Sequence, residues 1–230
     1  AGDKAISDFT LNGHDREPSW YRWSNKTEHI VIEEGITGIG SEAFSSFTET
    51  KSITMGESVK RINRMAFWAN VSLREIKLSS NITVIQGDAL SGGRELETIK
   101  LPMRLRKMCS LSGQEKLEKI VMPDSITNMQ SAMFSECKKL KYIKLPAKIR
   151  KIKSYDFAGC KKLKKLTIPK SVKTVSMSAF AGSGLKKIVL PENVTTIKNG
   201  DAGRKVFKYI KGINYPTKNL RVIEIHSKKI

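Results

Sequence analysis

The chain has 230 residues, of which 39% are hydrophobic and 28% are charged, and its formal net charge is +20. No run approaches the roughly 18 consecutive apolar residues that a transmembrane helix needs, and three cysteines are too few for a disulfide scaffold. The positive charge is uneven: residues 1–100 carry 12 Lys and Arg against 14 Asp and Glu, whereas residues 101–230 carry 30 against 8. Such asymmetry indicates either a polyanionic partner or a strongly solvated C-terminal half.

Residues 1–28 precede the first repeat and are predicted to form an N-terminal cap. Trp20 and Trp23 are expected to cover the first coil. Terminal units of a stacked protein are usually atypical, because an exposed end of a sheet can pair with other chains.

Residues 29–211 form a series of repeats with a period close to 23 residues. The clearest pair is CKKLKYIKLP, beginning at Cys137, and CKKLKKLTIP, beginning at Cys160. A fixed period between about 20 and 50 residues is typical of stacked supersecondary units rather than of one globular core. The length of the chain allows eight or nine such coils.

Each repeat carries three apolar segments. The first has two apolar residues spaced by two, which places both side chains on one face of a short strand. A second apolar pair follows, after a proline in five repeats, and an Ala-Phe pair comes third, where a helical or 3-10 turn is expected. The leading strand residues are Ile30, Ile53, Ile76, Ile99, Ile120, Ile143, Leu166, Ile188 and Ile223.

Two segments depart from the repeat. The fourth repeat, residues 98–118, is two residues short and lacks the Ala-Phe pair, having the sequence SLSG at residues 110–113 instead, so a local change in curvature is expected. An insertion follows Ile197, and its apolar residues are expected to fold over the end of the stack. Residues 212–230 are predicted to supply a terminal strand and a C-terminal cap. The apolar residues of the insertion are Val206, Phe207, Tyr209, Ile210 and Tyr215.

The template Leu-x-x-Ile-x-Leu-Pro-x-x-Val-x-x-Ile-x-x-x-Ala-Phe-x-x-Cys resembles the BspA-type leucine-rich repeats of bacterial and protozoan surface proteins. The resemblance covers roughly residues 20–230 and includes the segment Pro18–Trp23. It implies a right-handed, curved leucine-rich-repeat solenoid of short parallel strands, with the sheet on its concave side. It also implies a secreted or cell-surface protein that binds rather than catalyses, whose signal peptide and anchor we expect to lie outside this chain.

Motifs for catalysis are absent from the sequence. There is no P-loop, no Cys-x-x-Cys, no His-Glu-x-x-His and no Gly-x-Ser-x-Gly, so we expect neither an enzyme nor a bound cofactor or metal. The histidines His14, His29 and His226 lie near the two ends, and His29 is expected to face solvent. Cys137 and Cys160 occupy one slot in neighbouring coils, within reach of a disulfide, although two reduced core thiols fit this apolar slot better than a disulfide or a metal site.

The basic surface is the candidate binding site. Strand alternation turns a set of lysines and one tyrosine outward, but solvated lysines that serve solubility explain the same pattern. The expected partner is a host protein or an anionic glycan; nucleic acid is disfavoured because only Tyr142 interrupts the basic strip on the sheet, whereas single strands need several stacking aromatics. A structural spacer in a longer surface protein is the alternative function. The candidate residues are Lys100, Lys119, Lys141, Tyr142, Lys144, Lys164, Lys165, Lys186 and Lys187.

Overall fold

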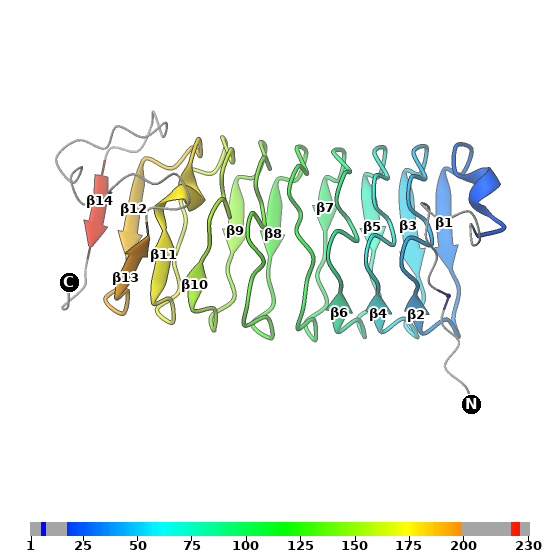
Figure 1. Ribbon diagram of the computed structural model, residues 1–230, viewed down its shortest axis with the longest axis horizontal. Coiled ribbons are helices and arrows are strands. Elements are labelled where there is room, and N and C mark those ends of the chain that lie inside the picture. Colours follow the sequence, from blue (N-terminus) through cyan, green and yellow to red (C-terminus); the bar gives the residue numbers. More distant parts are fainter. Residues whose placement is uncertain (1–5, 8–17, 199–221, 226–230) are drawn as a thin grey trace.

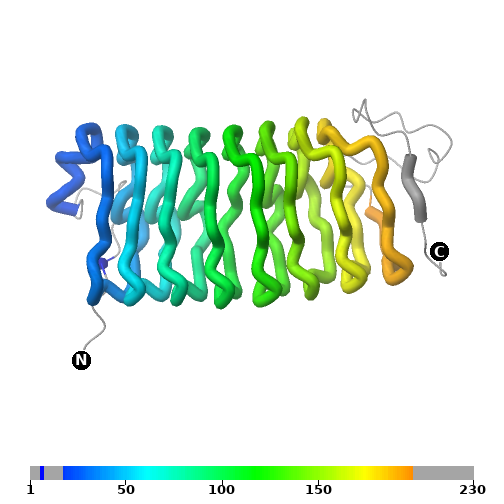
Figure 2. Tube along the Cα trace, turned by 180° about the vertical axis from the view of Figure 1, so that it is seen from behind, coloured from blue at the N-terminus to red at the C-terminus, as the bar shows by residue number. Residues whose placement is uncertain are grey.

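The computed structural model describes residues 6–7, 18–198 and 222–225. These residues wind into a row of stacked coils with the strands of successive coils side by side (Figures 1 and 2). The described residues make about seven turns, slightly fewer than the eight or nine expected. Within the described ranges, helix is limited to two 3-10 turns, η1 (Tyr21–Trp23) and η2 (Met177–Phe180). The fold is a parallel β-solenoid, as the period predicts.

The first strand of each repeat builds one side of the solenoid. The leading apolar residues lie opposite one another in register, for example Ile30 beside Ile53 and Ile120 beside Ile143. This side is divided into three parallel sheets, with the orders β1-β3-β5-β7, β8-β9 and β12-β14. Their bounds are β1 (His29–Ile32), β3 (Ser52–Met55), β5 (Glu75–Lys77), β7 (Thr98–Ile99), β8 (Lys119–Val121), β9 (Tyr142–Lys144), β12 (Lys187–Leu190) and β14 (Val222–Ile225).

The second apolar pair of each repeat builds another side from very short strands. Two parallel sheets form here, with the orders β2-β4-β6 and β10-β11-β13. Strand β6 is continued by an isolated parallel bridge between Val84 and Lys107. The bounds are β2 (Gly38–Ile39), β4 (Arg61–Ile62), β6 (Val84–Ile85), β10 (Lys151–Ile152), β11 (Thr174–Ser176) and β13 (Thr196–Lys198).

The third side carries the Ala-Phe segments, and its backbone bonds run between coils. In the first coil, alternate amides donate to the second coil: Phe44 N to Ala66 O at 2.8 Å and Ser46 N to Trp68 O at 2.7 Å. Residues with left-handed backbone flank the pair, such as Glu42 (φ 58°). Among the described Ala-Phe segments only η2 forms a 3-10 turn. In most of the others every second amide bonds to the next coil, whereas the amides between them bond within their own turn, as Ser45 N does to Glu42 O at 3.1 Å.

The core is a continuous apolar column in which equivalent residues stack on one another. Phe134, Phe157 and Phe180 are fully buried, with successive ring centroids 6.0 Å apart and interplanar angles of 10° and 7°. Phe44 and Phe67 stack in the same way at 5.6 Å. Burial of these aligned faces, which no single coil could achieve, holds the stack together.

The first side is interrupted where the repeat is irregular. No ladder joins β7 to β8 across the 21-residue fourth repeat, where Leu111 is buried in the slot that phenylalanine fills elsewhere. Residues 164–168 were also predicted as a strand, but the structure has no regular strand there and Leu166 is only half-buried. Ile143 and Leu166 are therefore not partners in a parallel ladder, in contrast to the equivalent residues of the N-terminal coils.

The N-terminal cap differs in part from the prediction. The Trp20 ring stacks on Phe44 at 5.8 Å and its indole N–H donates to Ala43 O at 2.8 Å, as a cap requires. Trp23, however, does not cover the coil: it is 51% exposed, and Tyr21 packs against Phe47 instead. Ile6 adds a further contact through its amide, which donates to the carbonyl of Gly38 beside β2.

The final strand is present as β14, which pairs with β12 in parallel, Ile188 lying beside Ile223. The insertion and the outer part of the predicted C-terminal cap, including Val206, Phe207, Tyr209, Ile210, Tyr215 and Leu220, lie outside the described residues. His14 and His226 also lie outside them.

Gly184 marks a close approach between two coils. The repeat that contains it is one residue short, and its amide donates to Cys160 O at 3.0 Å. A methyl group on Gly184 would come 2.1 Å from the main-chain oxygen of Lys161. We expect Gly184→Ala to lower the free energy of unfolding by about 1–3 kcal/mol, since overpacking forces the backbone apart. Urea unfolding beside a Gly87→Ala control, where a methyl meets no atom within 4 Å, tests this; equal midpoints for the two variants would contradict it.

Candidate functional site

The side chains predicted for binding are all exposed in the structure. Four of them lie within β8, β9 and β12, and the others lie immediately beside first-side strands or in the irregular segment 164–168. We call the outward side of these strands the sheet face. The strand burial patterns alternate between exposed and buried, as predicted. The nine residues are Lys100, Lys119, Lys141, Tyr142, Lys144, Lys164, Lys165, Lys186 and Lys187.

Tyr142 lies in the middle of the sheet face and is 50% exposed. It is the register partner of Lys119 in β8, and the Lys119 ammonium lies 5.4 Å from the centroid of its ring. This cation–π contact is worth about 0.5–1 kcal/mol at an exposed site. One face of the ring is thus occupied by a lysine of the same chain, which reduces the surface that Tyr142 offers for stacking.

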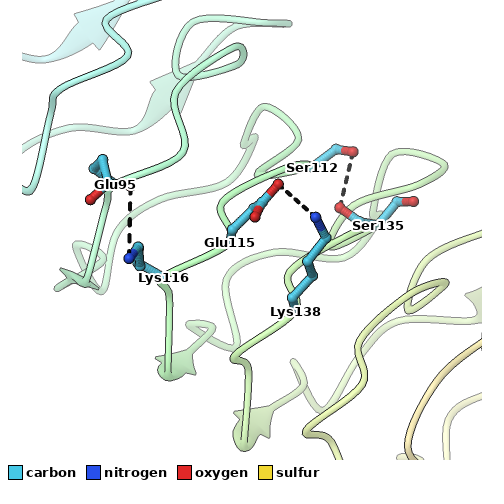
Figure 3. Close-up of polar contacts among 6 residues, drawn as sticks. All are labelled: Glu95, Ser112, Glu115, Lys116, Ser135 and Lys138. Carbon is cyan, nitrogen blue, oxygen red and sulfur yellow. Dashed lines mark hydrogen bonds and ion pairs between the residues drawn. The ribbon is translucent and has the colours of Figure 1, made fainter.

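Several lysines of the central coils are paired with glutamates of the preceding coil. Lys138 Nζ lies 2.8 Å from Glu115 Oε1, and Lys116 Nζ lies 4.0 Å from Glu95 Oε1 (Figure 3). Beside them the Ser112 hydroxyl donates to Ser135 O at 3.1 Å. These contacts span 21 or 23 residues in sequence, so the period of the stack places each pair together.

The same pairing reaches two of the predicted binding residues. Lys141 Nζ lies 2.9 Å from Glu118 Oε1, and this hydrogen bond holds the pKa of Glu118 below its usual value. Lys144 Nζ lies 3.9 Å from Asp124 Oδ2. The two lysines therefore contribute less free positive charge than sequence reasoning assumed. The signal was an acid 20–23 residues earlier, which is informative only once the coil register is known.

The lysines that follow have no such partners. In the described part of the chain, no carboxylate lies within 4.0 Å of Lys164, Lys165 or Lys186. The nearest equivalent positions in the preceding coil are occupied by Lys141 and Tyr142. The positive potential of the sheet face is therefore concentrated near its C-terminal end.

Two other polar side chains have a structural role. His29 is exposed, as expected, and its Nδ1 lies 2.8 Å from the hydroxyl of Ser52 in the next coil. Glu34 accepts hydrogen bonds from the amides of Glu57 (2.5 Å) and Ser58 (3.0 Å) of the next turn, which lower its pKa. Both residues join neighbouring coils.

The three cysteines are buried free thiols. Cys137 Sγ donates to Leu111 O at 3.1 Å and Cys160 Sγ donates to Phe134 O at 3.0 Å. Burial raises the pKa of Cys160 and of Cys109 to about 12. Protonated thiols of this kind are poor nucleophiles and poor metal ligands.

Asp156 is a buried acid that stands directly before Phe157, where other repeats have alanine. Its carboxylate accepts hydrogen bonds from the amides of Lys153 (2.6 Å) and Met133 (3.4 Å), yet it has no exposed surface. Burial raises its pKa to about 7, against the opposing effect of these bonds. In the N-terminal coils the amide equivalent to that of Lys153 donates to a carbonyl of the preceding coil, as Gln86 N does to Ile62 O. In the coil of Asp156, the carboxylate of Asp156 replaces that carbonyl as the acceptor for the Lys153 amide.

The sequence matches a known repeat profile over most of its length. The profile of the BspA type leucine rich repeat region, in six copies, matches residues 17–112 and 107–214. The chain belongs to the BspA-type leucine-rich repeat family. No curated protein matches it significantly.

Solved structures of bacterial leucine-rich repeat proteins share the fold of this BspA-type chain. A protein from Bacteroides ovatus is 19% identical with a TM-score of 0.62; the match covers 85% of this chain and 60% of that one. A protein from Eubacterium ventriosum is 20% identical, with a TM-score of 0.63 over 100% of this chain and 67% of that one. The leucine-rich repeat protein of T. pallidum is 23% identical, with a TM-score of 0.62 and coverages of 68% and 77%. The chain thus spans 60–77% of the length of these relatives.

The described residues contain neither a membrane helix nor a metal-binding cluster. No helix among them has the length and apolar character needed to cross a bilayer. No group of three or more His, Cys, Asp or Glu side chains converges there in a way that could hold a metal ion.

Proposed function

We propose that this BspA-type chain is a non-catalytic recognition module that acts outside the cell and binds a host matrix protein or an anionic glycan. The observation that carries the proposal is the sheet face, whose outward side chains are exposed and become strongly basic toward the C-terminal end. A charged, uncovered face raises the local concentration of an oppositely charged partner and steers its approach.

A spacer function is the second candidate. It is favoured by the length relation to the Bacteroides ovatus protein, of which this chain covers 60%. A spacer holds other modules apart and needs no partner of its own. The two functions therefore differ in whether the isolated chain retains a ligand.

Chromatography on immobilised heparin separates these functions. As a binder, the intact chain should elute above about 0.3 M NaCl, because a multivalent electrostatic contact survives moderate screening. Reversal of two charges on the basic part, Lys144→Glu with Lys165→Glu, should shift elution to lower salt. The matched control, Lys60→Glu with Lys77→Glu in the N-terminal coils, should shift it less.

The same three proteins should be tested on immobilised mucin and on a purified matrix protein by biolayer interferometry. Binding to any of the three surfaces that weakens with salt and with the C-terminal reversal supports a recognition module. Flow-through on heparin at 0.15 M NaCl, together with no binding to mucin or matrix protein, would leave the spacer as the function.

A further inference from the structure

The cross-coil ion pairs end abruptly along the stack. Glu95, Glu115 and Glu118 each neutralise a lysine of the following coil. In the next coil the equivalent positions are lysines, so lysine now stacks on lysine. The backbone bonds set this register: Lys162 N donates to Lys138 O at 3.3 Å, which places Lys162 beside Lys139 of the preceding coil.

A group of six exposed lysines results, which we call the lysine patch. Within the described residues none of the six lies within 4.0 Å of a carboxylate, and the only polar contact of an ammonium group is that of Lys164 Nζ with Lys161 O at 3.3 Å. The patch runs from the corner after the third side onto the sheet face. Its members are Lys139, Lys161, Lys162, Lys164, Lys165 and Lys186.

The backbone under the lysine patch is also irregular. Residues 164–168 lie between β9 and β12 in sequence but form no regular strand, and within the described coils their amides join no neighbouring ladder. Lysine ammonium groups about 5 Å apart would repel by about 0.8 kcal/mol in bulk water, a cost that the flexible lysine stems can reduce by moving apart. The lysines of the patch are thus gathered with no carboxylate between them, which favours an anion.

The composition of the lysine patch limits the partner. Folded protein interfaces are poor in lysine and rich in aromatic residues and arginine, whereas all six residues here are lysine. Arginine, with its planar fork, suits bidentate contact with carboxylate or phosphate; lysine is a flexible, hydrated point charge. Single-stranded nucleic acid needs several stacking rings, and Tyr142 on the sheet face already has Lys119 against it.

We propose that the lysine patch is the anchoring site for a linear polysaccharide bearing sulfate or carboxylate groups. This inference rests on the proposed recognition function and narrows it to one partner class and one part of the surface. Because lysine side chains are long and flexible, they can contact the anionic groups of a polysaccharide in several alignments, and no shaped pocket is required. The paired lysines Lys138, Lys141 and Lys144 then contribute little, although they lie in the adjacent coil.

The test compares two variants, each of which loses four positive charges from the C-terminal half of the chain. The patch variant carries Lys161→Gln, Lys162→Gln, Lys164→Gln and Lys165→Gln, and the control variant carries Lys148→Gln, Lys151→Gln, Lys170→Gln and Lys173→Gln, which lie elsewhere on the coils. Thermal unfolding establishes that both are folded. Binding to immobilised heparin is then measured by biolayer interferometry between 0.1 and 0.4 M NaCl.

The patch variant should bind heparin about 30-fold or more weakly at 0.15 M NaCl, with a shallower salt dependence, because about four cation–anion contacts are lost. The control should stay within about threefold of the intact chain. Equal loss in both variants would overturn the patch and leave the proposed function standing. No heparin binding by the intact chain would also overturn the patch, but the recognition function is removed only if mucin and matrix protein fail to bind as well. Competition by DNA as effective as that by dextran sulfate, at equal charge concentration, would overturn the polysaccharide assignment.

Discussion

Replacement of Asp156 with asparagine should stabilise the protein by about 2–4 kcal/mol at pH 8 and leave its stability at pH 4 almost unchanged. Burial raises the pKa of Asp156 from 3.8 to about 7 in the folded chain. The folded state therefore holds the proton over a range in which the unfolded chain has already released it. Stability is highest below pH 4, falls as the pH rises toward 7, and stays low above that value.

Asparagine is the appropriate replacement because it resembles the protonated acid in shape and keeps an oxygen for one of the two amides, those of Lys153 and Met133, that bond to Asp156. Thermal unfolding of the variant and of the original chain between pH 4 and 9 gives the difference at each pH. Asp124→Asn is the control, since this carboxylate accepts the Ala147 amide (2.7 Å) on an exposed turn. A difference for Asp156→Asn that does not grow between pH 4 and 7 would contradict the prediction.

The fold can be predicted from the sequence because every repeat makes the same contacts with its neighbours. The spacing between Ile30 and Ile53 recurs along the chain, and one register therefore satisfies all the buried positions together. The left-handed backbone on the third side is harder to predict from the sequence. Its only sign is glycine at positions such as Gly92 and Gly159, whose φ angles are 80° and 70°. The caps do not repeat, so no second copy shows which of their residues are buried. Whether Tyr21 or Trp23 packs on the first coil depends on the direction in which the chain enters that coil.

The candidate site was only partly predictable. Alternation correctly turned the lysines outward, but the pairing of Lys141 with Glu118 requires knowledge of which positions face each other across coils. The repulsion within the lysine patch and the loss of strand geometry around Leu166 are likewise properties of stacked coils rather than of one repeat. The sequence therefore predicts that the surface is positively charged, whereas the structure shows which of those charges are not paired with a carboxylate.

Phe157→Ala should produce the largest loss of stability among core substitutions, about 3–5 kcal/mol. Phe157 is the middle ring of the stack, with Phe134 and Phe180 each 6.0 Å away, so its removal leaves a cavity that faces both neighbouring coils. Urea unfolding followed by far-UV circular dichroism measures the loss. Phe157→Leu is the matched control, because leucine already occupies this slot in two other coils, as Leu90 and Leu111. This variant should lose only about 1–1.5 kcal/mol of stability.

The same substitution should also divide the cooperative unit. In a solenoid each coil is stabilised mainly by its immediate neighbours, so a weakened junction allows the coils beyond it to unfold first. For Phe157→Ala we expect a broader transition with a smaller dependence on urea concentration than in the original chain, as an intermediate with ordered N-terminal coils becomes populated. A sharp transition with unchanged slope, displaced by less than about 1 kcal/mol, would mean that stacking at Phe157 does not couple the coils.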